Sequence, residues 1–108
     1  CTGTALNDKT ETAALKKVFG ENAYKLKVSS TKSMTGHMLG AAGAVEALAS
    51  VMTLVDGVVP PTINYKVKDD ECDLDITPNK AVKAQKTYAL STSLGFGGHN
   101  GCLAFKRL

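Results

Sequence analysis

The chain has 108 residues, of which 44% are hydrophobic and 21% charged, values typical of a globular protein with at most one domain. The net charge of +3 comes from dispersed lysines without a basic run or interleaved aromatic residues, so nucleic-acid binding is not indicated. No uncharged apolar run approaches the ~18 residues that a membrane span needs, and no basic-then-apolar leader opens the chain, so a membrane protein is not expected.

The first elements along the chain are a helix and a short strand. Asn7 or Asp8 is predicted to cap a helix from about Lys9 to Phe19, and Gly20 is predicted to end it. The alternation of side chains from Tyr24 to Ser30 then predicts a short strand.

The segment from His37 to Val55 is almost entirely apolar or small, and Glu46 is its only charged residue. It is too long for a strand, and its glycines and alanines suit close approach to a neighbouring element. We therefore expect a buried helix here. Asp56-Gly57 should stop it, and Pro60-Pro61 should fix an extended exit.

The last third of the chain predicts a surface excursion followed by a β-hairpin. Residues 66–83 are polar and rich in turn formers, while Thr87–Leu94 and Cys102–Leu108 have the composition of strands. The glycine-laden segment Gly95–Gly101 is the predicted hairpin turn. The resulting order, α-β-α and then a hairpin, has too few strands to cover the central helix, which indicates part of a larger layered α/β body.

Cysteine spacing and surface charge restrict the setting of the protein. Cys1, Cys72 and Cys102 fit neither a zinc site nor a disulfide framework, so a reducing compartment is expected. Cys102 lies in an apolar run, where a free cysteine usually acts as a small buried hydrophobe. A mildly basic surface would suit an acidic protein partner, although an ordinary solvated surface is the favoured explanation of so small an imbalance.

Two charged residues and a histidine form the first candidate site. His37 is placed at the start of the buried helix, where the helix dipole disfavours extra positive charge, so a neutral imidazole could donate one N–H to a carbonyl or enolate oxygen. A core histidine with a structural role is the open alternative. Lys32 lies beside the mostly apolar stretch and Glu46 lies within it, and an ion pair between them is predicted.

The glycine turn is the second candidate site. A loop such as Gly95–Gly101 allows positive φ angles and can aim backbone N–H groups at an anion, as an oxyanion hole does. It lacks the Gly-Lys-Ser/Thr ending of a phosphate-binding loop, so nucleotide hydrolysis is not expected.

Four ordered blocks of the sequence resemble the elongating β-ketoacyl-acyl-carrier-protein synthases, especially those of the synthase II type. The blocks are Cys1–Thr4 with Asn7-Asp8, Ser29–His37 followed by Leu39–Gly43, Pro60–Asn64, and Gly95–Asn100. The resemblance covers the whole chain, residues 1–108. It implies the C-terminal part of that family's C-terminal domain, within a thiolase-like layered α/β/α/β/α fold.

The resemblance also implies an activity, a decarboxylative Claisen condensation in fatty-acid elongation. By this resemblance, His37 corresponds to the second histidine of the family's catalytic set. Lys32 corresponds to its active-site lysine, and Glu46 to the ion-pair partner of that lysine. Phe96 matches the gating aromatic residue whose backbone N–H contributes to an oxyanion hole, with Gly95 and Gly97 supporting it. The implied partners are acyl-carrier protein and a second subunit in a homodimer; the implied location is the cytoplasm, and no cofactor is implied.

Some positions depart from the family pattern. None of the three cysteines matches the nucleophile, and the first catalytic histidine would immediately precede Cys1, so the chain alone is expected to be inactive. Cys1 replaces a usual glycine and Leu94 a common phenylalanine. Thr92 replaces a common asparagine, which weakens the case for a monovalent-cation site near Glu46 and Ser91; no other metal site is implied.

Two other functions stay open on the sequence. One is a non-catalytic relative of the same fold, like the chain-length-factor subunits, although such proteins tend to lose the residues retained at positions 32, 37 and 96. The other is a coenzyme-A or phosphate-binding module that uses the helix beginning near Gly36.

Overall fold

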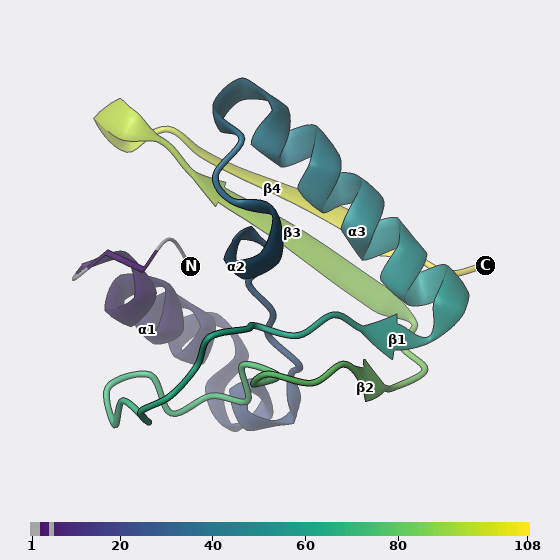
Figure 1. Cartoon of the computed structure of the whole chain (residues 1–108), viewed down its shortest axis with the longest axis horizontal. Coiled ribbons are helices and arrows are strands. Elements are labelled where there is room, and N and C mark those ends of the chain that lie inside the picture. Colours follow the sequence, from purple (N-terminus) through teal and green to yellow (C-terminus); the bar gives the residue numbers. More distant parts are fainter. Residues whose placement is uncertain (1–2, 5) are drawn as a thin grey trace. The chain divides into compact units, whose positions relative to one another are not determined.

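The computed structural model describes residues 3–4 and 6–108, which form two compact units. The first unit combines the chain up to residue 37 with residues 60–81, and the second combines residues 38–59 with residues 82–108. Figure 1 shows the elements of both units. The first unit holds α1 (Asn7–Phe19), the 3₁₀ helix η1 (Gly20–Lys25) and α2 (Lys32–Thr35); the second holds η2 (Leu39–Ala41), α3 (Ala42–Asp56), β1 (Val58–Val59), β2 (Val82–Lys83), β3 (Tyr88–Leu94), η3 (Phe96–Gly98) and β4 (Asn100–Lys106).

Helix α1 ends where the sequence predicts and begins slightly earlier. Gly20 has a φ of 56°, and its N–H donates to the Lys16 carbonyl oxygen, which closes the last turn. The predicted caps are wrong, because Asn7 and Asp8 already lie inside the first turn and the cap position is Leu6, which makes no side-chain cap hydrogen bond. Asp8 instead adds an acidic side chain to the first turn, where it complements the helix dipole.

The predicted strand from Tyr24 to Ser30 is wrong. Tyr24 and Lys25 belong to η1, and residues 26–30 belong to no helix or sheet. Side-chain alternation supplies only half of what a strand requires, because a strand also needs a neighbour along its whole length. Here the Val28 N–H donates to the Asp75 carbonyl oxygen at 2.9 Å, which ties the segment to the excursion instead.

The excursion predicted at residues 66–83 holds little regular structure, as expected: residues 66–81 contain no helix or sheet strand, and its last two residues form β2. It is held by an isolated parallel bridge between Thr62 and Pro78.

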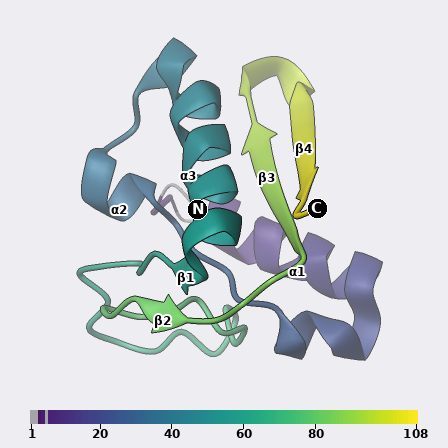
Figure 2. The same ribbon diagram turned by 90° about the vertical axis from the view of Figure 1, so that its right-hand side faces the viewer.

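The predicted helix from His37 to Val55 is shorter than expected and much less buried. Leu39 adopts a left-handed φ of 51°, so α3 begins only at Ala42. Gly57, with a φ of 66°, ends it as predicted. Leu54 is the only described residue of α3 in the buried class. The helix packs on β3 within the second unit, and Figure 2 shows the two lying side by side.

The predicted hairpin is confirmed. Strands β3 and β4 pair antiparallel from Tyr88 opposite Lys106 to Leu94 opposite Asn100, with the glycine turn between them. Gly101 lies inside β4 rather than in the turn. Cys102 is exposed, so its predicted role as a buried hydrophobe is wrong for this chain.

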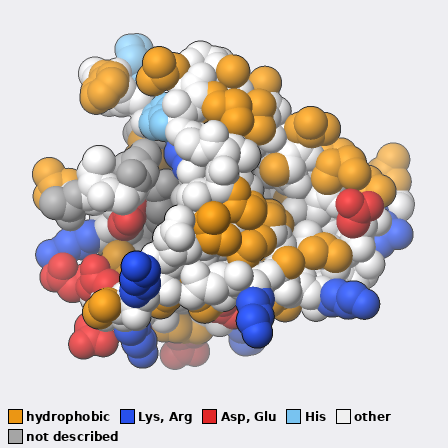
Figure 3. All heavy atoms as spheres, in the orientation of Figure 1, with side chains coloured by type: hydrophobic (Ala, Val, Ile, Leu, Met, Phe, Trp, Pro, Cys, Tyr) orange, Lys and Arg blue, Asp and Glu red, His pale blue; other side chains and the backbone are white. Residues whose placement is uncertain are grey.

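Helix α3 carries a row of exposed apolar side chains, and Figure 3 shows hydrophobic side chains along it on this face of the molecule. They are Leu48, Val51, Met52 and Val55. The stretch Leu39–Asp56, with a mean hydropathy of 1.4, is long and apolar enough to cross a membrane. The stretch includes the charged residues Glu46 and Asp56, so the expectation that no uncharged run of this length exists still holds, and a core helix of a soluble protein passes the same test.

Candidate functional site

Lys32 and His37 lie close together in the chain, at the two ends of one short turn of structure in the first unit. Lys32 opens α2 and is half-buried, while His37 is exposed and follows Gly36, whose φ of 75° ends the helix. His37 precedes α3 by five positions, so the argument that a helix N-terminus keeps its imidazole neutral does not apply.

The chain that leads into this turn is fixed by hydrogen bonds to residues 60–63. The Ser29 hydroxyl donates to the Pro60 carbonyl oxygen at 2.6 Å, and the Ser30 N–H donates to the Thr62 hydroxyl at 2.9 Å. The Ser33 hydroxyl accepts from the backbone N–H of residue 63, also at 2.9 Å. A loop that meets a neighbour at three successive points has few alternative conformations.

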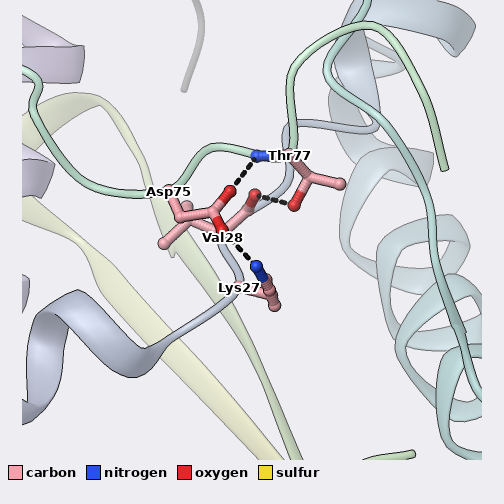
Figure 4. A network of polar contacts seen from close by, with 4 residues as sticks. All are labelled: Lys27, Val28, Asp75 and Thr77. Carbon is pink, nitrogen blue, oxygen red and sulfur yellow. Dashed lines mark hydrogen bonds and ion pairs between the residues drawn. The ribbon is translucent and has the colours of Figure 1, made fainter. Parts of the chain in front are cut away.

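On its other side the same segment meets residues 75–77 (Figure 4). Thr77 donates its hydroxyl to the Val28 carbonyl oxygen at 2.9 Å, and the Asp75 carboxylate accepts from the Thr77 N–H at 3.0 Å. Lys27 forms an ion pair with the same carboxylate. Thr77 is completely buried and has a φ of 53°, a conformation that costs a β-branched residue about 1–3 kcal/mol.

The glycine turn of the second unit has the geometry that its composition predicts. The Gly95 N–H donates to the His99 carbonyl oxygen at 2.7 Å and closes the loop. Gly97 and Gly98 have φ angles of 77° and 82°, which L-residues rarely adopt. Phe96 stands at the tip of the turn with a relative exposure of 101%. The turn therefore presents an aromatic side chain beside two glycines whose conformation other residues rarely adopt.

Glu46 on α3 and Ser91 on β3 are both half-buried and belong to the second unit, as do Gly95, Phe96 and Gly97. Lys32 belongs to the first, so its ion pair with Glu46 stays a prediction. Over residues 3–4 and 6–108 there is no cluster of three or more His, Cys, Asp or Glu side chains that could hold a metal. Cys1, for which the family pattern has glycine, lies outside the described residues.

A ladder of ion pairs, unforeseen from the sequence, joins α1 and the following chain to residues 71–75. Lys9 pairs with Glu71 at 2.7 Å, Lys16 with Asp73, and Lys27 with Asp75. The hydrogen bond to Glu71 raises the pKa of Lys9, and the one to Asp73 raises the pKa of Lys16. The same Lys16 contact lowers the pKa of Asp73, assisted by the Tyr24 hydroxyl, which donates to that carboxylate at 3.1 Å.

A shallow depression of about 240 Å³ lies beside this ladder. Its lining consists of Tyr65, Lys68, Cys72, Asp73, Leu74, Asp75, Ile76 and Pro78. None of these is a residue that the sequence singles out for chemistry, so the depression and the predicted site are separate features.

Solved structures identify the fold as that of the ketosynthases. The chain superimposes with a TM-score of 0.94 and 41% identity on a structure described as "AntDE:AntF (apo): type II PKS acyl-carrier protein in complex with its ketosynthase bound to the hexaketide", covering 97% of this chain and 26% of that one. It matches "The ishigamide ketosynthase/chain length factor" with a TM-score of 0.93 and 40% identity, over 99% of this chain and 26% of that one. The chain thus has the C-terminal part of a thiolase-like α/β fold, as predicted.

The sequence places it more narrowly. Residues 1–66 match the model of the β-ketoacyl synthase C-terminal domain, and the chain belongs to that family. It is 56% identical to 3-oxoacyl-[acyl-carrier-protein] synthase 2 of Staphylococcus aureus (strain COL) over 98% of its length. It is 54% identical to the protein of the same name from Synechocystis sp. (strain ATCC 27184 / PCC 6803 / Kazusa). The chain spans about a quarter (26%) of the length of these curated relatives.

Proposed function

We propose that this chain is part of a longer β-ketoacyl-acyl-carrier-protein synthase that elongates fatty acids. The observation that carries the proposal is the 56% identity to a 3-oxoacyl-[acyl-carrier-protein] synthase 2 over 98% of the chain. Lys32, His37 and Phe96 are the residues to which the family resemblance assigns the chemistry.

In the proposed reaction a cysteine outside this chain carries the growing acyl group as a thioester. Malonyl-carrier protein then loses carbon dioxide, and the electron pair of the broken C–C bond forms an enolate on the remaining thioester. His37 donates a hydrogen bond to the enolate oxygen as negative charge develops there. The enolate carbon attacks the acyl thioester, a new C–C bond forms, and the cysteine leaves as a thiolate.

The glycine turn serves the other half of this reaction. The N–H of Phe96 stabilises the oxyanion that forms on the acyl thioester, while its exposed ring gates the site. Gly95 and Gly97 support that backbone geometry. Lys32 supplies positive charge beside the malonyl group, and Glu46 is its proposed ion-pair partner.

Acyl-carrier protein is the proposed partner, because one structural neighbour is a ketosynthase in complex with such a protein. A homodimer of the whole synthase and a location in the cytoplasm complete the proposal. The free thiols of Cys72 and Cys102 fit a reducing compartment.

The decisive experiment measures malonyl-carrier-protein decarboxylation by the whole synthase carrying His37→Ala. Loss of an oxyanion donor predicts a decrease of about 10²-fold or more in kcat with folding intact. His37→Gln is the matched control, because its amide can still donate a hydrogen bond and should retain more activity than alanine. Unchanged decarboxylation in His37→Ala would reject the catalytic role.

The second candidate function is a non-catalytic subunit of the same fold, and the second structural neighbour, whose description includes a chain-length factor, favours keeping it. It predicts no decarboxylation even by the unaltered protein. A coenzyme-A-binding module predicts saturable binding of coenzyme A by the 108-residue chain alone, which the synthase proposal does not.

A further inference from the structure

Thr77 is fully buried and adopts a backbone conformation that β-branched residues disfavour. Its φ is 53° and its relative exposure is 0%. Left-handed conformations suit asparagine and glycine, and two nearby asparagines, Asn64 and Asn79, adopt them with φ angles of 62° and 59°. A β-branched residue in the same conformation requires a compensating interaction, and Thr77 has several.

The hydrogen bonds of Thr77 join three separate segments of the first unit. Its N–H donates to Asp75, its hydroxyl donates to the Val28 carbonyl oxygen, and its own carbonyl oxygen accepts from the Thr62 N–H at 2.9 Å. Thr62 in turn accepts from the Ser30 N–H through its hydroxyl. Thr77 therefore holds the chain at Val28 directly and at Ser30 through one intermediary.

The held segment leads straight into the proposed catalytic turn. Lys32 is the second residue after Ser30, and α2 then carries the chain to His37. The Thr77 hydroxyl donates to this segment at Val28, and it does so from a residue whose backbone is left-handed. The strained residue is therefore also one that holds this segment, and we call the hydrogen bonds of Thr77 to Val28 and of Thr62 to Ser30 the clamp.

We propose that Thr77 is a positioning residue for the decarboxylation half of the condensation. It acts on Lys32 and His37 by fixing the backbone at Val28 and Ser30, and it touches neither substrate nor reacting atoms. The proposal rests on the proposed function, since it concerns the orientation of the groups that face the malonyl thioester. Misplacement of a catalytic group by about 1 Å is enough to lower a rate by about 10²-fold.

The test uses the whole synthase and separates its two half-reactions. Thr77→Val keeps the shape and the β-branch but removes the hydroxyl, whereas Thr77→Ser keeps the hydroxyl and relieves the crowding. We expect Thr77→Val to lower kcat for malonyl-carrier-protein decarboxylation by about 10-fold to 10²-fold, with KM within about twofold. Transfer of an acyl group to the nucleophilic cysteine should stay within about twofold, and Thr77→Ser should restore decarboxylation to within about threefold.

Thr62→Val provides a second approach to the same clamp, because it removes the hydroxyl that accepts from the Ser30 N–H. It should show the same split between the half-reactions, and it carries the test if Thr77→Val does not fold. Equal losses in both half-reactions, or no loss of decarboxylation, would overturn the positioning role.

His37→Ala is measured in the same assay to separate the two proposals. If His37→Ala loses decarboxylation and both threonine variants keep it, the positioning role is overturned and the proposed function stands. If His37→Ala keeps decarboxylation, the proposed function is overturned, and the positioning role with it.

Discussion

The glycine turn allows a prediction whose size follows from backbone geometry alone. Gly98 has a φ of 82°, and a Cβ atom added to it would meet nothing within 4 Å. The substitution Gly98→Ala therefore introduces no clash with a neighbour, and its whole cost is the strain of an L-residue in a left-handed conformation. That strain amounts to about 1–2 kcal/mol.

Such a cost changes the population of the turn rather than the fold. Because 1.4 kcal/mol is a factor of ten, the native turn should lose a factor of about 5–30 relative to other loop conformations. If the turn must hold its shape to aim the N–H of Phe96, acyl transfer to the nucleophilic cysteine of the whole synthase should slow by up to that factor. Single-turnover acylation with acyl-carrier protein measures this rate directly.

Gly40→Ala is the matched control. Gly40 also has open space around a built Cβ, but its φ lies outside the left-handed range, so alanine should be tolerated there. The reasoning fails if Gly98→Ala acylates as fast as Gly40→Ala. It fails also if both variants slow equally, since strain at the turn would then not be the cause.

Two further predictions concern stability. Leu54 of α3 is 4% exposed, whereas Leu48 of the same helix is 62% exposed. Leu54→Ala should therefore lower the free energy of unfolding by about 3 kcal/mol, and Leu48→Ala by less than about 1 kcal/mol. Urea denaturation of the 108-residue chain compares the two variants, and equal losses would contradict the difference in burial. The pKa of Asp73 lies below its ordinary value of 3.8 because Lys16 hydrogen-bonds its carboxylate. That pair stabilises the fold above the unfolded-state pKa and loses the effect as pH falls through the folded-state value. Asp73→Asn should therefore flatten the acid limb of stability against pH, and an unchanged limb would show that the ion pair contributes nothing.

The elements that the sequence predicted correctly are those marked by local chemistry. Gly20 and Gly57 end their helices because each adopts a positive φ and satisfies a carbonyl of the last turn. The hairpin of β3 and β4 follows from two β-favouring runs on either side of a glycine-rich turn. Each of these features is decided by residues close to one another in the chain.

The errors concern what distant residues decide. The segment from Tyr24 to Ser30 alternates like a strand, but its partner turned out to be a loop about 50 residues further on, at Asp75 and Thr77. The apolar stretch after His37 indicated a buried helix, whereas α3 leaves Leu48 and Val55 exposed. An apolar helix indicates that its side chains are buried in some larger structure. This chain spans only about a quarter of the length of its relatives, so residues outside it can supply that burial.

That difference bears on the isolated chain. The exposed apolar side chains on α3 form a surface of the kind that favours association in water. The ladder was not predicted, although the sequence holds one signal for it: acidic residues at every second position, Glu71, Asp73 and Asp75, which an extended segment would place on one side. The lysines that answer them lie far upstream, so the signal for the pairing was visible on one partner only.

The glycine turn and the segment around Thr77 both contain residues with a left-handed backbone, but only in the turn could this be predicted from the sequence. At Gly97 and Gly98 the left-handed backbone is announced by glycine, so the turn was predictable from sequence. At Thr77 the same region of conformational space is occupied by a residue type that normally avoids it, and the sequence offers no sign. The hydroxyl explains the choice: glycine would relieve the strain there but would lose the donor that holds Val28. Thr77 thus combines a conformation that its residue type disfavours with a side chain bonded to the chain that leads to Lys32, and this combination is the basis of the proposed positioning role.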